Sequence, residues 1–160
     1  MSPVQSTITT HGEDADAHPR CPVFLAAFWL HEDKEHHAIS VRTSTAERGW
    51  HIFHINGWMG APLNFEVKRN EEHPLLSISC LYIQQIGWVS RGNLDKIEPV
   101  CRAIRPTERL WDGTQDIIAA RSNPDWVADA IEELRVALII EPLGVEDNGG
   151  RVRLLSPMYP

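Results

Sequence analysis

The side chains in this sequence that are best suited to chemistry are histidines in segments of alternating polarity. His36, His51 and His54 lie in such segments, and an imidazole changes its charge near neutral pH, which suits it to giving and taking protons. Glu66, in a later segment, could orient one of these rings. We therefore take these four residues as candidate acid–base residues. The alternative is that the histidines are surface or half-buried strand residues and that Glu66 faces water.

Other kinds of site find less support in the sequence. Several potential metal ligands occur close together in one turn between strands. They lack the His-Glu-x-x-His spacing, and a turn does not give the i, i+4 geometry of a helix. The chain has no CxxC, no Gly-x-Ser-x-Gly and no Gly-rich phosphate loop. We predict no metal and no cofactor. The ligand-rich turn consists of His31, Glu32, Asp33, Glu35, His36 and His37.

The chain has six tryptophans, which could line an apolar pocket and offer an indole N–H to a ligand. Trp58 follows an Asn-Gly turn signal in a loop, and we take Trp58 and Trp50 as candidate substrate-binding residues. Packing in the core is the simpler interpretation of most tryptophans. We prefer it for Trp29 and Trp126, which lie on elements expected to face the core.

A helix is predicted from Ser122 or Asn123 to about Ile140. Either residue can cap it, and Pro124 then falls at the first helical position, where its missing N–H costs nothing. Such a helix start can hold an anion or activate a nucleophile, but this one carries neither a cysteine nor a Gly-rich loop. We take Ser122 and Asn123 as candidate substrate-binding residues, with Ser122 as a less favoured nucleophile. The predicted apolar face comprises Val127, Ala130, Ile131, Leu134, Ala137 and Leu138.

A sheet and a few helices must position these residues. Alternation in the segment 36–42 puts Ile39 and Val41 on one face and His36 on the other. A second helix is predicted from Asn93, with a kink or a split at Pro99. Strands followed by helices indicate an α+β fold, with an antiparallel sheet packed with two or three helices. Strands are predicted over residues 23–30, 36–42, 50–55, 63–68 and 75–89, the last with a bulge or close approach at Gly87.

The chain of 160 residues is long enough for one domain with a sizeable core. Residues 1–20 are predicted to be a flexible N-terminal arm, residues 21–142 a single α+β domain, and residues 143–160 a C-terminal tail. The tail could add an edge strand over residues 151–155.

Composition restricts the partners and the compartment. A net charge of −7 argues against nucleic acid or an anionic membrane as the main partner. No apolar run approaches the roughly 18 residues that a membrane span needs, and the polar, acidic N-terminus is no signal peptide. The odd number of cysteines favours reduced thiols, with Cys80 and Cys101 in the core. We expect a cytoplasmic protein, and the oligomeric state stays open.

Five short segments occur in an order that carries a family resemblance. They are His36-His37-Ala38-Ile39, then Trp50-His51-Ile52 or Phe53-His54-Ile55, then Asn64-Phe65-Glu66, Gln85-Ile86-Gly87 and Asn123-Pro124-Asp125-Trp126-Val127. In this order they resemble an uncharacterised family of fungal proteins that we associate with the circularly permuted papain-like fold. That family has strands with His-Trp-Ala-Leu, Tyr-His-Val, an aromatic-Glu pair and Ile-Gly, followed by a helix that opens Asn-Cys-x-x-Trp-Val.

The resemblance implies a fold without its usual chemistry. In permuted papain-like enzymes, such as the lecithin retinol acyltransferase group, a histidine on a strand is the base for a cysteine at the start of a later helix. The resemblance puts His36 in the place of the base and His51 or His54 in the place of the next polar residue. It puts Asn123 in the place of the cysteine. Because an amide cannot act as a thiolate, the chain is predicted not to be a working cysteine hydrolase.

The function favoured at this point is a cofactor-independent protein of fungal secondary metabolism that binds or converts a small organic molecule. If it is catalytic, we expect isomerisation, cyclisation or dehydration by proton transfer at the histidines, with Trp58 near the pocket mouth. The alternative is a catalytically inactive pseudoenzyme that serves as a binding or interaction module. The first hypothesis requires an apolar pocket into which a histidine points, and the second an exposed apolar patch.

Overall fold

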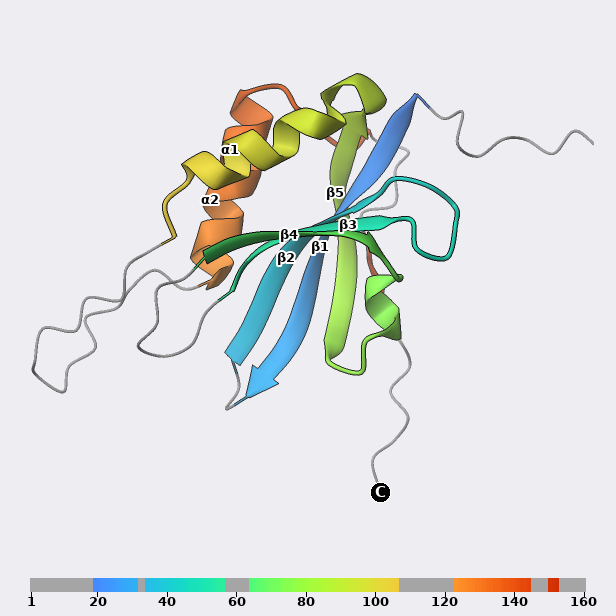
Figure 1. The fold of residues 1–160 in the computed structure, drawn as a ribbon, viewed down its shortest axis with the longest axis vertical. Helices are drawn as coiled ribbons and strands as arrows, with labels where there is room; N and C mark the ends of the chain where they lie inside the picture. The colour runs from blue at the N-terminus through green and yellow to red at the C-terminus, as the bar shows by residue number, and fades with distance from the viewer. Residues whose placement is uncertain (1–18, 32–33, 57–63, 107–122, 145–149, 153–160) are drawn as a thin grey trace, which may run out of the picture.

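The computed structural model describes residues 19–31, 34–56, 64–106, 123–144 and 150–152. In this part of the chain seven strands form one sheet, accompanied by two α-helices and two short 3-10 helices (Figure 1). In chain order the elements are β1 (Arg20–His31), β2 (Lys34–Arg42), β3 (Trp50–Asn56), β4 (Asn64–Glu71), η2 (Pro74–Leu76), β5 (Cys80–Ser90), η3 (Arg91–Lys96), α1 (Ile97–Ala103), α2 (Asn123–Val136), β6 (Ile140–Glu141) and β7 (Arg151–Val152).

The sheet is antiparallel throughout. Its strand order is β4-β3-β2-β1-β5-β6, and β7 also pairs with β5. The first four strands therefore form a meander, and β5 returns to the free side of β1. An antiparallel sheet packed with helices is the α+β arrangement predicted from the sequence, and the structure confirms it.

Both α-helices pack on one face of the sheet and bury the main core (Figure 1). The predicted alternation in β2 is confirmed, because Ile39 and Val41 are fully buried in that core. Trp126 is buried as predicted: its ring lies 5.7 Å from that of Phe65. His36 and Ala38 of β2 face the other side of the sheet, where η2 covers a smaller core.

Gly87 in β5 shows both features predicted for it. The pairing of β1 with β5 shifts register beside it, so β5 carries a bulge there. A Cβ atom at this position would lie 2.3 Å from the carbonyl oxygen of Glu141. Glycine is thus required because β6 approaches the backbone of β5 too closely for any side chain.

Two helix predictions need correction. The helix that begins at Asn123 ends at Val136, not at Ile140, because Leu138 turns to a φ of 56° and Ile140 enters β6. Leu138 is 80% exposed and is not part of the apolar face. The helix predicted from Asn93 divides into η3 and α1 at Ile97. Pro99 then lies in the first turn of α1, where a missing N–H is tolerated.

The placement of Trp29 in the core is wrong. Strand β1 continues to His31, so Trp29 lies near the end of the sheet and is 54% exposed.

No helix among the described residues is long and apolar enough to cross a membrane.

Candidate active site

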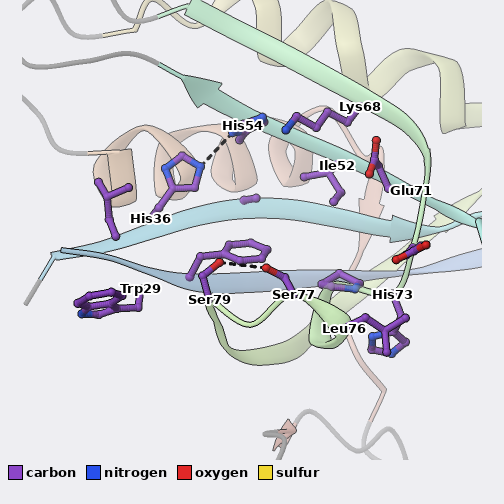
Figure 2. A pocket seen from close by; sticks show the side chains of 15 residues that line it. Trp29, His36, Ile52, His54, Lys68, Glu71, His73, Leu76, Ser77 and Ser79 are labelled. Carbon is purple, nitrogen blue, oxygen red and sulfur yellow. Dashed lines mark hydrogen bonds between the residues drawn. The ribbon is translucent and has the colours of Figure 1, made fainter.

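A hollow of about 400 Å³ lies on the face of the sheet opposite the two α-helices (Figure 2). Its size falls near the lower end of the range for small-molecule pockets, about 300–1,000 Å³. We call it the histidine pocket; it is lined by Phe28, Trp29, Leu30, His36, Ala38, Ile52, His54, Lys68, Glu71, Glu72, His73, Pro74, Leu76, Ser77 and Ser79.

Three of the four candidate acid–base residues form a chain at this pocket. Nε2 of His36 lies 2.9 Å from Nδ1 of His54, and the two rings meet edge to face (Figure 2). Nε2 of His54 lies 3.0 Å from a carboxylate oxygen of Glu66. The oxygen does not lie along the N–H bond of the ring, so the two groups are within ion-pair distance but do not form a well-aligned hydrogen bond. The order of the chain is His36, His54, Glu66.

The strands diverge where they present these two rings. Pairing of β2 with β3 ends at Ile39 and Phe53, although the same register, continued for two more residues, would put His37 opposite Ile55. The amide of Asn123, at the start of α2, occupies that place. Its Oδ1 accepts from the backbone N–H of His37 at 2.5 Å and its Nδ2 donates to the carbonyl of Ile55 at 3.5 Å.

The side-chain amide of Asn123 therefore replaces a peptide group in the ladder and fixes the separation of the strands that carry His36 and His54. Because both backbone groups are partly buried, they need such partners. The amide of Asn123 is engaged by β2 and β3, and Asn123 is not among the residues that line the histidine pocket, while its contact with a substrate stays a prediction. It is a positioning residue for the pair.

The surroundings keep both histidines neutral near pH 7. Burial, with further contributions from His54, His37 and Lys68, lowers the pKa of His36 to about 4. Burial also lowers the pKa of His54, although the neighbouring Glu66 carboxylate opposes that shift. Two adjacent imidazoles cannot both be charged at low cost, so the pair acts as one coupled unit.

The contacts favour one arrangement of protons. A carboxylate beside Nε2 of His54 favours the tautomer that carries its proton there. Nδ1 of His54 is then an acceptor, and His36 must donate to it from Nε2. This leaves Nδ1 of His36 as the nitrogen of the pair with a free lone pair. A base on one ring is thus linked through the second ring to a carboxylate.

His51 does not belong to this site. It lies on the other face of the sheet, in a second hollow of about 430 Å³ with Arg69, Arg91 and Glu98. Phe53 and Ile55 lie two and four residues after His51 on β3, and both point into the main core. Because side chains alternate along a strand, His51 points to the same side. Of the two histidines, His54 is the one that lines the histidine pocket together with His36.

The candidate substrate-binding tryptophans are not in the pocket as far as the structure describes them. Trp50 is only 3% exposed and packs in the smaller core, 5.3 Å from Phe24 and 4.6 Å from His73. It contacts the pocket lining through His73 and is not itself a lining residue, and its role in substrate binding stays a prediction. Trp58 and Ser122 lie outside the described residues.

Several lining residues were missed by sequence reasoning. His73 caps η2, since its Nδ1 accepts from the N–H of Leu75 at 3.1 Å, and this brings 73–77 over the sheet. The His-Pro pair suggested only a chain break.

Lys68 and Glu71 both line the pocket although they are three residues apart on a strand. A bulge in β4 makes this possible. Trp50 pairs with Glu71 and Ile52 with Lys68, so β4 has one more residue than β3 in this interval, and Asn70 within it has a φ of 56°.

Comparison with known proteins gives a family but no activity. The family profile "Family of unknown function (DUF6540)" matches residues 23–141, which is most of the chain. The chain belongs to the DUF6540 family. No curated protein and no solved structure matches it significantly. The matched segment runs from the third residue after the start of β1 to the end of β6. It therefore contains all residues that line the histidine pocket and most of the core.

The cysteines and the potential metal ligands offer no second site in the described residues. Burial raises the pKa of all three thiols, of Cys80 to about 11 and of Cys101 to about 12. A nucleophilic cysteine needs the opposite shift. No group of three or more His, Cys, Asp or Glu side chains in the described ranges is arranged to hold a metal ion.

Proposed function

We propose that this DUF6540 protein binds a small organic molecule in the histidine pocket and catalyses a proton transfer in it without a cofactor. The observation that carries the proposal is the 2.9 Å contact between His36 and His54 in the wall of a pocket of small-molecule size. Isomerisation, cyclisation and dehydration are the reaction types that need only a base and an acid.

The proposed step uses the free lone pair on Nδ1 of His36. This nitrogen takes a proton from the substrate, the bond between that proton and its carbon or oxygen breaks, and the electron pair stays on the substrate. His36 can pass its Nε2 proton toward Nδ1 of His54, whose own Nε2 lies 3.0 Å from a carboxylate oxygen of Glu66. The positive charge is thereby shared with a ring beside a carboxylate. Return of a proton to another substrate atom completes an isomerisation with no net change in charge.

Replacing His36 with glutamine tests this function. A panel of enolisable ketones and keto acids is incubated in D2O with the protein, and loss of the α-proton signal is followed by NMR. We expect wild-type protein to accelerate exchange of at least one compound and His36→Gln to lose at least about 100-fold of that rate, the usual contribution of a general base. His37→Gln is the matched control, because His37 is adjacent but on the opposite face of β2. Equal rates for wild type and His36→Gln would contradict the proposal.

One observation favours the alternative, a catalytically inactive binding or interaction module. Large apolar side chains are exposed around one end of the sheet: Trp29, Leu30, Leu76 and Ile78, the last at 94%. Such a group is typical of an interaction surface. Trp29, Leu30 and Leu76 also line the histidine pocket, so they equally suit its entrance. A protein that binds a partner there, and whose His36→Gln variant binds it unchanged, would be such a module.

We also propose that the fold is a permuted papain-like one. What supports this is the order of the elements, in which a strand with a histidine precedes a helix that opens with Asn123 and packs on the same sheet. The cysteine of such enzymes is replaced by Asn123, whose amide bonds to the strands. A cysteine hydrolase is therefore not part of the proposal.

A further inference from the structure

The polar residues of the histidine pocket are ordered by charge along the ladder between β3 and β4. Glu66 pairs with His54, and Lys68 follows on the same face as the partner of Ile52. The Lys68 ammonium group points toward His54 in Figure 2, and its charge helps to lower the pKa of both pocket histidines. A cation therefore stands beside His54, the hydrogen-bonded partner of the proposed base His36.

Lys68 is not neutralised by the part of the chain that the structure describes. Glu66, the nearest carboxylate on its strand, contacts His54, while Glu98 is bound by Arg69 and Arg102 on the other face. No described carboxylate lies within ion-pair distance of Lys68. An ammonium group at the rim of a pocket, without such a partner, is suited to a ligand anion.

Along β4 beyond Lys68, the charge of the pocket lining reverses. The bulge at Asn70 turns Glu71 onto the pocket face, one ladder step beyond Lys68 and near Trp50. Glu72 also lines the pocket, and its carboxylate lies 3.7 Å from Arg48. The lining includes apolar side chains as well, among them Phe28, whose ring lies 6.4 Å from that of His36, and Ile52, which pairs with Lys68. A second anionic group next to Glu71 would meet a carboxylate.

We propose that the ligand of the histidine pocket is an apolar molecule with a single oxyanion, which Lys68 holds beside His54 and His36. The oxyanion is a carboxylate, a phenolate or the enolate oxygen formed when a carbonyl compound loses its α-proton. This rests on the proposed function, because it assumes that the pocket binds a small molecule. In the enolate case Lys68 stabilises the charge that develops when His36 takes the proton.

The test uses 2-naphthoate and its neutral analogue 2-naphthamide as probes of the full chain. Affinity is measured by calorimetry, and the place of binding by NMR shifts of the His36, His54 and Trp29 side chains. We expect naphthoate to bind about five- to tenfold more tightly than naphthamide, and Lys68→Met to abolish that preference. Lys68→Arg should retain it. Lys96→Met is the matched control, since it removes an equally exposed lysine from η3.

The outcomes separate this inference from the function on which it rests. If both probes shift the pocket resonances with equal affinity, or if Lys68→Met keeps the preference, the oxyanion assignment is overturned and the pocket remains. If neither probe shifts His36, His54 or Trp29, both the ligand class and the proposed function fail. A dianion, 2,6-naphthalenedicarboxylate, should bind no more tightly than naphthoate, and tighter binding would contradict the role given to Glu71.

Discussion

Replacing Asn123 with alanine is expected to lower the free energy of unfolding by about 2–4 kcal/mol. The variant leaves the N–H of His37 and the carbonyl of Ile55 without their partner where β2 and β3 diverge. Each such partly buried group costs about 1–3 kcal/mol when it is left unpaired. Denaturant unfolding followed by circular dichroism measures the loss.

Two further variants separate this effect from ordinary helix chemistry. Asn123→Asp keeps the acceptor for His37 and loses the donor to Ile55, so we expect roughly half the loss. Glu132→Ala changes an exposed residue of the same helix and should alter stability by less than about 0.5 kcal/mol. An Asn123→Ala protein as stable as Glu132→Ala would show that the amide does not join the strands.

The second large effect is a loss of stability in mild acid. An unfolded histidine takes up its proton near pH 6.5, whereas His36 in the fold does so only near pH 4. Between these values the unfolded state binds more protons, so stability falls as the pH falls from about 6.5 toward 4. His36 alone should contribute about 1–2 kcal/mol, after allowance for its partial exposure. Burial lowers the pKa of His51, His54 and His73 in the same direction.

Measuring unfolding free energy at several pH values in wild type and His36→Gln isolates the share of His36. The variant should show a shallower decline between pH 6.5 and pH 4, whatever its stability at neutral pH. Parallel curves for the two proteins would mean that His36 titrates alike in the folded and unfolded chains, and that the pocket does not hold it neutral.

Local patterns predicted the sheet well. Alternation in β2 separated Ile39 and Val41, which lie in the core, from His36 on the other face, because successive side chains of a strand point to opposite sides. In β3 the pattern was ambiguous, since Trp50 and Ile52 make the pocket face apolar too. The choice between His51 and His54 therefore required the strand pairing.

Features that depend on distant residues could not be predicted. Asn123 has the sequence context of a helix cap, and only the gap between β2 and β3 shows that its amide substitutes for a peptide group. The shared face of Lys68 and Glu71 follows from the left-handed backbone of Asn70, which no pattern in β4 indicated. The exposure of Trp29 follows from the length of β1, where local hydrophobicity favoured burial.

The most direct test of the central claim is long-range ¹H–¹⁵N NMR of the imidazoles of His36 and His54 across a pH titration. We expect both rings to be neutral at pH 7, His36 to carry its proton on Nε2 and none on Nδ1, and His36 to titrate near pH 4. His36 protonated on Nδ1 at pH 7, or titrating near pH 6.5, would contradict the claim that these rings form a neutral base linked to Glu66.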